Sequence, residues 1–190
     1  MGVVTLYKIR ITGDPALHTR ALEVLAIDDY IRELVADMFE TMDSAPGVGL
    51  AATQIGVGLR IFVYSYSTDD QEVRGVAINP QLSISEFSDE ELDEEADAEG
   101  CLSIPGERFP LKRANRALLM ATDLDGHGYQ IEAEGWLARI FQHEFDHLEG
   151  MLYADRLVKP HKRLMKKAIK ENEWGVPGLS WLPGQDYLEP

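Results

Sequence analysis

The sequence predicts an α+β fold in which mainly antiparallel strands pack around a central helix. Strand-like segments cluster between an early amphipathic helix, residues 28–43, and a late helix, about residues 136–149. Helices and strands therefore do not alternate along the chain, as they would in a doubly wound parallel sheet. A turn at Asp125 and Gly126 separates two strand-like segments and is typical of an antiparallel hairpin.

The early helix is indicated by the spacing of its apolar residues. Residues 28–43 begin with two acidic residues, which favour a helix start, and Ser-Ala-Pro-Gly follows them as a stop. The apolar positions recur at the i, i+3, i+4, i+7 spacing of one helix face and are Ile31, Leu34, Val35, Met38 and Met42. We therefore expect this helix to pack one face on the core.

The strand-like segments differ in pattern. Residues 60–66 are apolar or aromatic on both faces, which indicates a buried strand. Residues 75–80 indicate a shorter strand that ends at Asn79 and Pro80. Residues 116–135 indicate two strands on either side of the turn at Asp125.

Two helices are predicted after the strands. The first extends from about Trp136 to Glu149, and Gly150 is suited to ending it. The second covers roughly residues 160–173. The length of 190 residues fits one domain, 1–190, with a C-terminal helix and tail at about 160–190.

Composition and charge exclude some functions. The hydrophobic content of 45% and the charged content of 27% are ordinary for a globular protein, but the net charge is −15. Such a chain has no overall positive field to attract phosphates, so we expect no DNA partner. Cys101 is alone and cannot form an internal disulfide. With no signal peptide and no run of about 18 apolar residues, the sequence predicts a cytoplasmic protein without membrane contact.

Two charge runs interrupt the chain. Between Glu86 and Glu99, nine of fourteen residues are Asp or Glu, which predicts a solvated, extended loop, with a cation or a partner as the alternative. Residues 160–172 are basic instead, and either form a solvated helix face or dock on an anionic surface such as RNA. The residues expected to pack this helix on the body are Leu164, Met165, Ala168 and Ile169.

The sequence Gln-His-Glu-Phe-Asp-His-Leu-Glu-Gly, residues 142–150, suggests a metal site. His143 and His147 are four residues apart, so both imidazoles leave one helix face, and Glu144 beside them is suited to act as a base. The alternative is a surface helix with two unrelated histidines. Several apolar neighbours argue for a central, buried helix, in which histidines need partners such as a metal: Trp136, Leu137, Ile140, Phe141 and Leu148.

A third ligand is left open by the residues alone. His161, Glu171 and Glu173 lie downstream, but the extended metalloprotease spacing would need His where Tyr153 stands. Upstream, Cys101 lies in an apolar, turn-bounded segment. A single cysteine is most often a small core residue, whereas near two histidines its thiolate is a strong metal ligand.

Three motifs together resemble those of the peptide deformylases. They are Gly-Val-Gly-Leu-Ala-Ala-Thr-Gln at 47–54, Glu-Gly-Cys-Leu-Ser at 99–103 and the segment 142–150, in the family's order and rough spacing. Similarity extends to residues 13–18 and, for one bacterial subgroup, to the tail at 174–184. The resemblance implies that Cys101, His143 and His147 hold one divalent metal. In the family this is Fe(II), with Ni, Co or Zn able to substitute, and residue types alone do not select among them.

The resemblance also implies a reaction. The enzyme would remove the N-formyl group from the methionine of newly made proteins and release formate. A metal-bound hydroxide would attack the formyl carbon, and Glu144 would take a proton and pass it to the leaving amine. The oxyanion would be stabilised by the side-chain amide of Gln54 and the backbone N–H of Leu102. Without the motif, Gln54 would more often be a surface amide.

Substrate binding is implied at a further set of positions. The backbone of Gly47, Val48 and Gly49 would pair with the peptide as an added strand, since glycine allows close backbone approach. Val48, Trp136 and Ile140 match the lining of a pocket for methionine. The other matching positions are Glu99, Gly100, Arg108 and Arg139.

Two positions leave details open. Arg139 replaces an aliphatic residue common in the family, and we expect its stem to line the pocket while its head reaches water. Asp146 either orients the metal ligands or faces solvent.

Two other functions were weighed. A zinc endopeptidase of the His-Glu-x-x-His type would not need Cys101. A non-catalytic metal-binding or ribosome-associated module would be marked by loss of Glu144, Gln54 or a ligand, and none is lost. In some family members a C-terminal helix docks on the ribosome, which the basic segment 160–172 resembles.

Overall fold

A computed structural model describes residues 5–68, 72–186 and 188. The strands are β1 (Ile9–Arg10), β2 (Gly49–Ala51), β3 (Ile61–Ser67), β4 (Glu72–Ile84), β5 (Ala98–Cys101), β6 (Ile104–Pro110), β7 (Arg116–Thr122), β8 (Gly128–Glu134) and β9 (Ser180–Trp181). The helices are η1 (Pro15–His18), α1 (Asp29–Ser44), η2 (Ala52–Ile55), α2 (Gly135–Leu148), α3 (Tyr153–Arg156) and α4 (His161–Glu171). No helix in this described part of the chain has the length and apolar character to cross a membrane.

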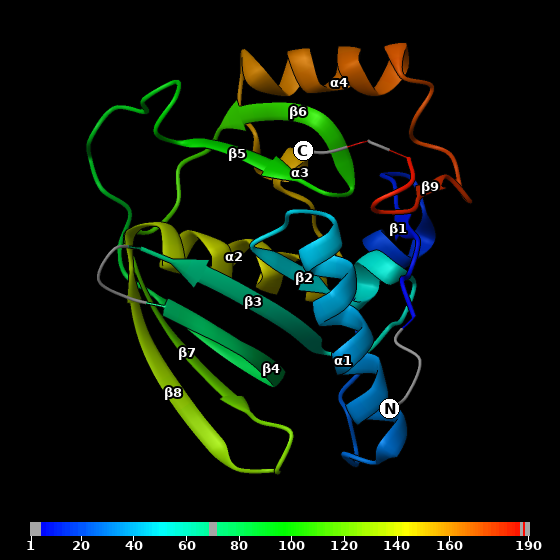
Figure 1. Cartoon of the computed structure of the whole chain (residues 1–190). Helices are drawn as coiled ribbons and strands as arrows, with labels where there is room; N and C mark the ends of the chain where they lie inside the picture. The colour runs from blue at the N-terminus through cyan, green and yellow to red at the C-terminus, as the bar shows by residue number, and fades with distance from the viewer. Residues whose placement is uncertain (1–4, 69–71, 187, 189–190) are drawn as a thin grey trace.

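The strands form three antiparallel sheets (Figure 1). The main sheet has five strands in the order β2-β3-β4-β7-β8. Two small sheets pair β5 with β6 and β1 with β9. The predicted hairpin is present, because β7 and β8 pair in register around the turn at Asp125. The predicted α+β fold with mainly antiparallel strands is confirmed.

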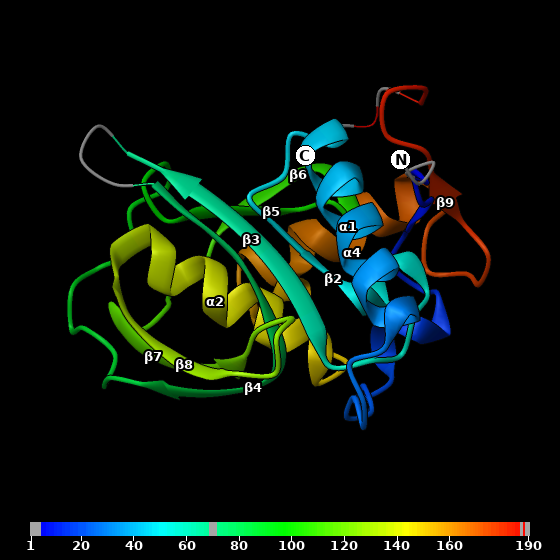
Figure 2. The ribbon, with the colours of Figure 1, turned by 60° about the horizontal axis from the view of Figure 1, so that its bottom comes forward.

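Strand β3 is buried on both faces because a helix covers each of them. Phe62 and Tyr64 belong to the core cluster that includes Phe141 of α2, whereas Ile61 and Val63 belong to the cluster that includes α1. Alternate residues of a strand point to opposite faces, so the continuous apolar run at 60–66 fits two helix layers. Figure 2 shows β3 lying between α2 and α1.

Strand β4 corrects one expectation. It does not end at Asn79 and Pro80 but continues to Ile84, with an irregular register between Ile78 and Gln81. Asn79 adopts a left-handed φ of 50°, and its side-chain amide bonds both the N–H and the carbonyl of Val24. A proline lacks the ladder N–H, so it is tolerated at such a bulge and need not end the strand.

The late helices lie close to their predicted bounds, and Gly150 adopts the left-handed conformation typical of a helix end, with φ of 75°. Helix α4 packs beside β6 (Figure 1), burying Met165 and Ala168, with Ile169 partly buried. The expected packing of Leu164 is wrong, since 47% of this residue is exposed. The acidic segment is a loop up to Asp97, but Glu99 lies in β5 and is buried, so the run is not solvated throughout.

Candidate active site

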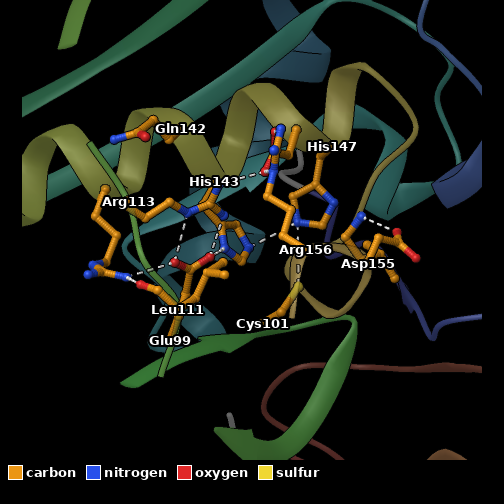
Figure 3. A network of polar contacts seen from close by, with 12 residues as sticks. Glu99, Cys101, Leu111, Arg113, Gln142, His143, His147, Asp155 and Arg156 are labelled. Atoms are coloured by element: carbon orange, nitrogen blue, oxygen red, sulfur yellow. Dashed lines mark hydrogen bonds and ion pairs between the residues drawn. The ribbon is translucent and has the colours of Figure 1, made fainter. Parts of the chain in front are cut away.

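Helix α2 and the end of β5 bring three metal-ligand side chains together. His143 Nε2 lies 3.1 Å from His147 Nε2, which lies 3.4 Å from Cys101 Sγ. The potential ligand atoms of all three residues lie within 4.8 Å of one another. Figure 3 shows these side chains converging from the helix and from the strand below it. Ligand bonds of about 2.0–2.3 Å would join all three atoms to one ion, so this donor set fits a divalent metal.

The orientation of His143 is set by Glu99. The His143 Nδ1 lies 2.6 Å from Glu99 Oε1, so in the neutral ring an Nδ1–H that donates to the carboxylate leaves the Nε2 lone pair for a ligand. Burial alone would lower the pKa of His143. The nearby charges of Cys101 and Glu99 outweigh burial, so the pKa of His143 is raised above its usual value. Burial together with His143 lowers the pKa of His147, which favours the neutral form that a ligand needs.

A charge network, buried except for Arg156, lies around His143 and His147 (Figure 3). Arg113 lies 2.6 Å from both Glu99 Oε1 and Asp146 Oδ2, and Arg156 also bonds Asp146 at 2.6 Å. Burial raises the pKa of Glu99, but the positive charge of Arg113 overcomes this and holds it well below the usual range. Asp146 is 4% exposed, so the alternative that it faces solvent is wrong. Its carboxylate bonds Arg113, which also bonds Glu99.

Glu144 lies against strand β2. It is buried, and among the described residues its Oε2 has no hydrogen-bond partner. Burial raises the pKa of Glu144 to about 7. A Cβ at Gly49 would overlap the Glu144 carboxylate, so this close approach requires glycine. The predicted pairing of Gly49 with a peptide stays a prediction.

Gln54 is fixed by hydrogen bonds at both ends of its amide. Its Oε1 accepts from the Ala51 N–H at 2.9 Å, and its Nε2 donates to Ser103 Oγ at 3.2 Å. The same Nε2 lies 3.8 Å from Cys101 Sγ. Gln54 is 1% exposed, so the surface-amide alternative is wrong.

A cavity of about 410 Å³ opens beside these groups. Every predicted site residue except His147, which lies beneath, lines it: Gly47, Val48, Gly49, Gln54, Glu99, Gly100, Cys101, Leu102, Arg108, Trp136, Arg139, Ile140, His143 and Glu144. Pro46 and Tyr66 also line the cavity but are not among the predicted site residues, although Pro46 lies in the predicted helix stop and Tyr66 ends the predicted strand at 60–66. The Arg108 guanidinium donates to the Ala98 carbonyl at 3.1 Å.

Arg139 departs from the expectation in one respect. Its head does not reach water, since the residue is 8% exposed. The guanidinium lies 2.7 Å from Asp97 Oδ1 and donates to the Leu111 carbonyl at 2.6 Å. It also lies 3.2 Å from Glu99. The end of the acidic segment supplies the countercharges, and the guanidinium also lies 5.2 Å from the ring centroid of Trp136.

A thiolate and two imidazoles beside a buried carboxylate, on a helix backed by antiparallel strands, define the class of metal-dependent hydrolases. The family model for polypeptide deformylase matches residues 6–163, and the chain belongs to this family. It is therefore an enzyme that removes formyl groups.

Individual relatives agree with the family match. Peptide deformylases from Mycolicibacterium paratuberculosis and Mycobacterium leprae are 50% and 49% identical over 185 residues, covering 93% of this chain and 94% of each relative. The Legionella pneumophila peptide deformylase structure superposes with a TM-score of 0.78 at 35% identity, covering 89% of this chain and 96% of that one. A Synechococcus elongatus peptide deformylase in complex with actinonin gives 0.77 at 31% identity, covering 94% and 95%.

Proposed function

We propose that this enzyme removes the formyl group from the N-terminal formyl-methionine of newly made proteins and releases formate. The observation that carries the proposal is the convergence of Cys101, His143 and His147, with Cys101, His143 and the neighbouring Glu144 lining one cavity. The three converging residues would hold one divalent metal, Fe(II) in the native enzyme, with Ni, Co or Zn able to substitute. When bound, the ion supplies acidity to a water and Lewis acidity to the formyl oxygen.

Glu144 is proposed as the general acid and base. It would take a proton from the attacking water and deliver it to the leaving amine of the peptide. A carboxylate is suited to both steps when its pKa lies near the working pH, and burial raises the pKa of Glu144 to about 7. Its Oε2 has no hydrogen-bond partner among the described residues, which would leave this oxygen to exchange protons with a reacting group.

The oxyanion that develops at the formyl oxygen would be stabilised by the Leu102 N–H and by Gln54 Nε2. The hydrogen bond from Ala51 holds Gln54 Oε1, which directs the NH₂ group toward Cys101 and Ser103. Such fixed donors act without reorganising during the reaction.

The peptide would add to the edge of the main sheet. Strand β2 is an edge strand in the described sheet, and Gly47, Val48 and Gly49 line the cavity. Backbone pairing there would bind peptides of many sequences. Methionine would enter between Val48, Trp136 and Ile140, while Glu99, Gly100, Arg108 and the Arg139 stem complete the wall.

Formate release tests this proposal. Protein prepared without oxygen and loaded with Fe(II) or Ni(II) is expected to release formate from formyl-Met-Ala-Ser without cutting an internal peptide bond. Cys101→Ser replaces a thiolate ligand by a hydroxyl, so both metal content and formate release are expected to fall. Full activity in Cys101→Ser, with internal cleavage, would favour a zinc endopeptidase. No formate from metal-loaded protein would favour a non-catalytic binding module. The family membership favours neither alternative.

We further propose that the enzyme works in the cytoplasm and meets its substrates at the ribosome through α4. The outward face of α4 carries exposed cations in an otherwise acidic protein: Lys162, Arg163, Lys166 and Lys167. Local positive charge attracts anionic surfaces such as ribosomal RNA.

Co-sedimentation with ribosomes tests the α4 contact. Changing the four cations of α4 to Glu is expected to abolish binding at low salt, since repulsion replaces attraction. Lys8→Glu combined with Arg32→Glu reverses exposed charges away from α4 and serves as the control. Equal ribosome binding by both variants would contradict the proposed contact through α4.

A further inference from the structure

The two-residue turn Leu102–Ser103 joins β5 to β6 directly after the ligand Cys101. Both of its carbonyls are held from outside these two strands. The Trp181 indole Nε1 donates to the Leu102 carbonyl at 2.9 Å, and the Thr12 N–H donates to the Ser103 carbonyl at 2.9 Å. The donors come from the two terminal segments of the chain, not from the catalytic helix.

Trp181 is firmly held where it makes this bond. It lies in β9, where it faces Ile9 of β1, and the Leu179 carbonyl accepts from the Ile11 N–H at 3.0 Å. The residue is 1% exposed and shares a core cluster with Leu102. A buried indole N–H needs an acceptor, and the Leu102 carbonyl satisfies it.

The Leu102–Ser103 turn touches each part of the proposed oxyanion site. Leu102 supplies the backbone N–H, and Ser103 Oγ accepts from the Gln54 amide at 3.2 Å. The Ser103 N–H donates to Cys101 Sγ at 3.4 Å. A rotation of the Leu102–Ser103 peptide would therefore swing the Ser103 N–H away from the ligand sulfur and loosen the contact with Gln54. It would also tilt the adjoining Cys101–Leu102 peptide, which carries the Leu102 N–H, because the two planar peptides meet at the Leu102 Cα.

We propose that Trp181 is a positioning residue for deformylation, whose indole N–H fixes the Leu102–Ser103 turn and thereby aims the Leu102 N–H at the oxyanion. This inference rests on the proposed function of Leu102 and Gln54. Trp181 lies outside residues 6–163, the span that the family model matches, so the C-terminal tail supplies this contact in addition to the family core.

Trp174 offers a matched comparison within the same tail. It is partly buried and packs against the same core cluster as Trp181. In the described part of the chain its indole donates no hydrogen bond to the Leu102–Ser103 turn. Replacing either tryptophan by phenylalanine removes contacts with the same core cluster, more of them at the fully buried Trp181, but only Trp181→Phe also removes the donor to Leu102.

The test measures formate release, thermal unfolding and amide hydrogen exchange for Trp181→Phe and Trp174→Phe. Trp181→Phe is expected to lower kcat by about 10-fold, less than the roughly 10²–10³-fold typical of losing a whole oxyanion donor. KM should change less than about twofold, because the β2 edge and the methionine pocket bind substrate before charge develops. Exchange at the Ser103 amide should become faster. Trp174→Phe should lower Tm without changing kcat or this exchange.

A tryptophan analogue with sulfur in place of the ring nitrogen, placed at position 181, keeps the ring shape and removes only the donor. It should reproduce the kcat loss, and it remains decisive where Trp181→Phe folds poorly. Equal kcat in this protein and the parent would overturn the inference, as would equal kcat losses in the two Phe variants. A parent protein that releases no formate overturns the proposed function instead. In that case the exchange rate of the Ser103 amide still tests the contact. An unchanged rate in the position-181 variants would show that Trp181 does not hold the turn.

Discussion

Glu144→Gln is expected to lower kcat for formate release by about 10²–10⁴-fold, the usual contribution of a general acid or base. Glutamine has the same shape as glutamate but accepts no proton at neutral pH. The loss should fall on kcat rather than on KM, because the proposed mechanism places Glu144 at the reacting groups and the peptide along β2. Steady-state kinetics with a formyl-methionine peptide measure the effect, and metal content should stay at the parent level.

Stability gives an independent check of the same variant in metal-free protein. Burial raises the pKa of Glu144 from 4.5 to about 7. A raised pKa contributes stability that is complete below pH 4.5 and is lost as pH rises through 7, because the folded state then buries a charge. The Gln variant has no charge to bury at this position, so it does not lose this contribution to stability as pH rises from 4.5 through 7. Its Tm relative to the parent should therefore increase between pH 5 and pH 8.

The exposed Glu134→Gln serves as the control, with kcat and the pH dependence of Tm expected to match the parent. Full activity in Glu144→Gln would exclude Glu144 as the proton carrier. A constant Tm difference across this pH range would contradict the effect of burial on its pKa.

Arg113→Met is expected to lower the free energy of unfolding by about 3–5 kcal/mol. Arg113 bonds both Glu99 and Asp146, and each of these carboxylates is nearly inaccessible to water. Methionine matches the length of the stem but leaves both charges with fewer partners in a buried setting. Urea unfolding of the metal-free protein measures the change.

Arg116→Met is the matched control. Arg116 pairs with Glu134, but both side chains are about 70% exposed. Such a surface pair contributes about 0.2–1 kcal/mol. If Arg113→Met cost no more than this control, the buried network would not stabilise the fold.

Helices α1, α2 and α4 and the hairpin were predictable because their signals are local, whereas the short helices η1, η2 and α3 were not predicted. The spacing from Ile31 to Met42 repeats every helical turn, and the turn at Asp125 is local too. Strand β4 was misjudged at Asn79 because the compensating bonds come from Val24, which is distant in sequence. That the 190 residues form one domain remains a prediction.

The site was predictable in unequal parts. His143, Glu144 and His147 lie on one helix, so their spacing indicated a site. Cys101 could be added only through the resemblance to a family, because no periodicity relates β5 to α2. Arg113 gave no signal at all, since an arginine between two strands is ordinarily solvated and its two buried partners become visible only in the fold.

The pairing of β1 with β9 has a consequence for how each new molecule matures. Ile9 faces Trp181, so this sheet joins segments that lie near opposite ends of the sequence. During translation, β1 leaves the ribosome long before β9 has been made. Until then, β1 has no β9 strand to pair with. The Leu102–Ser103 turn gains its Trp181 contact only after residue 181 has emerged. We therefore expect a nascent copy of this enzyme to reach full activity only after β9 has been made and paired with β1.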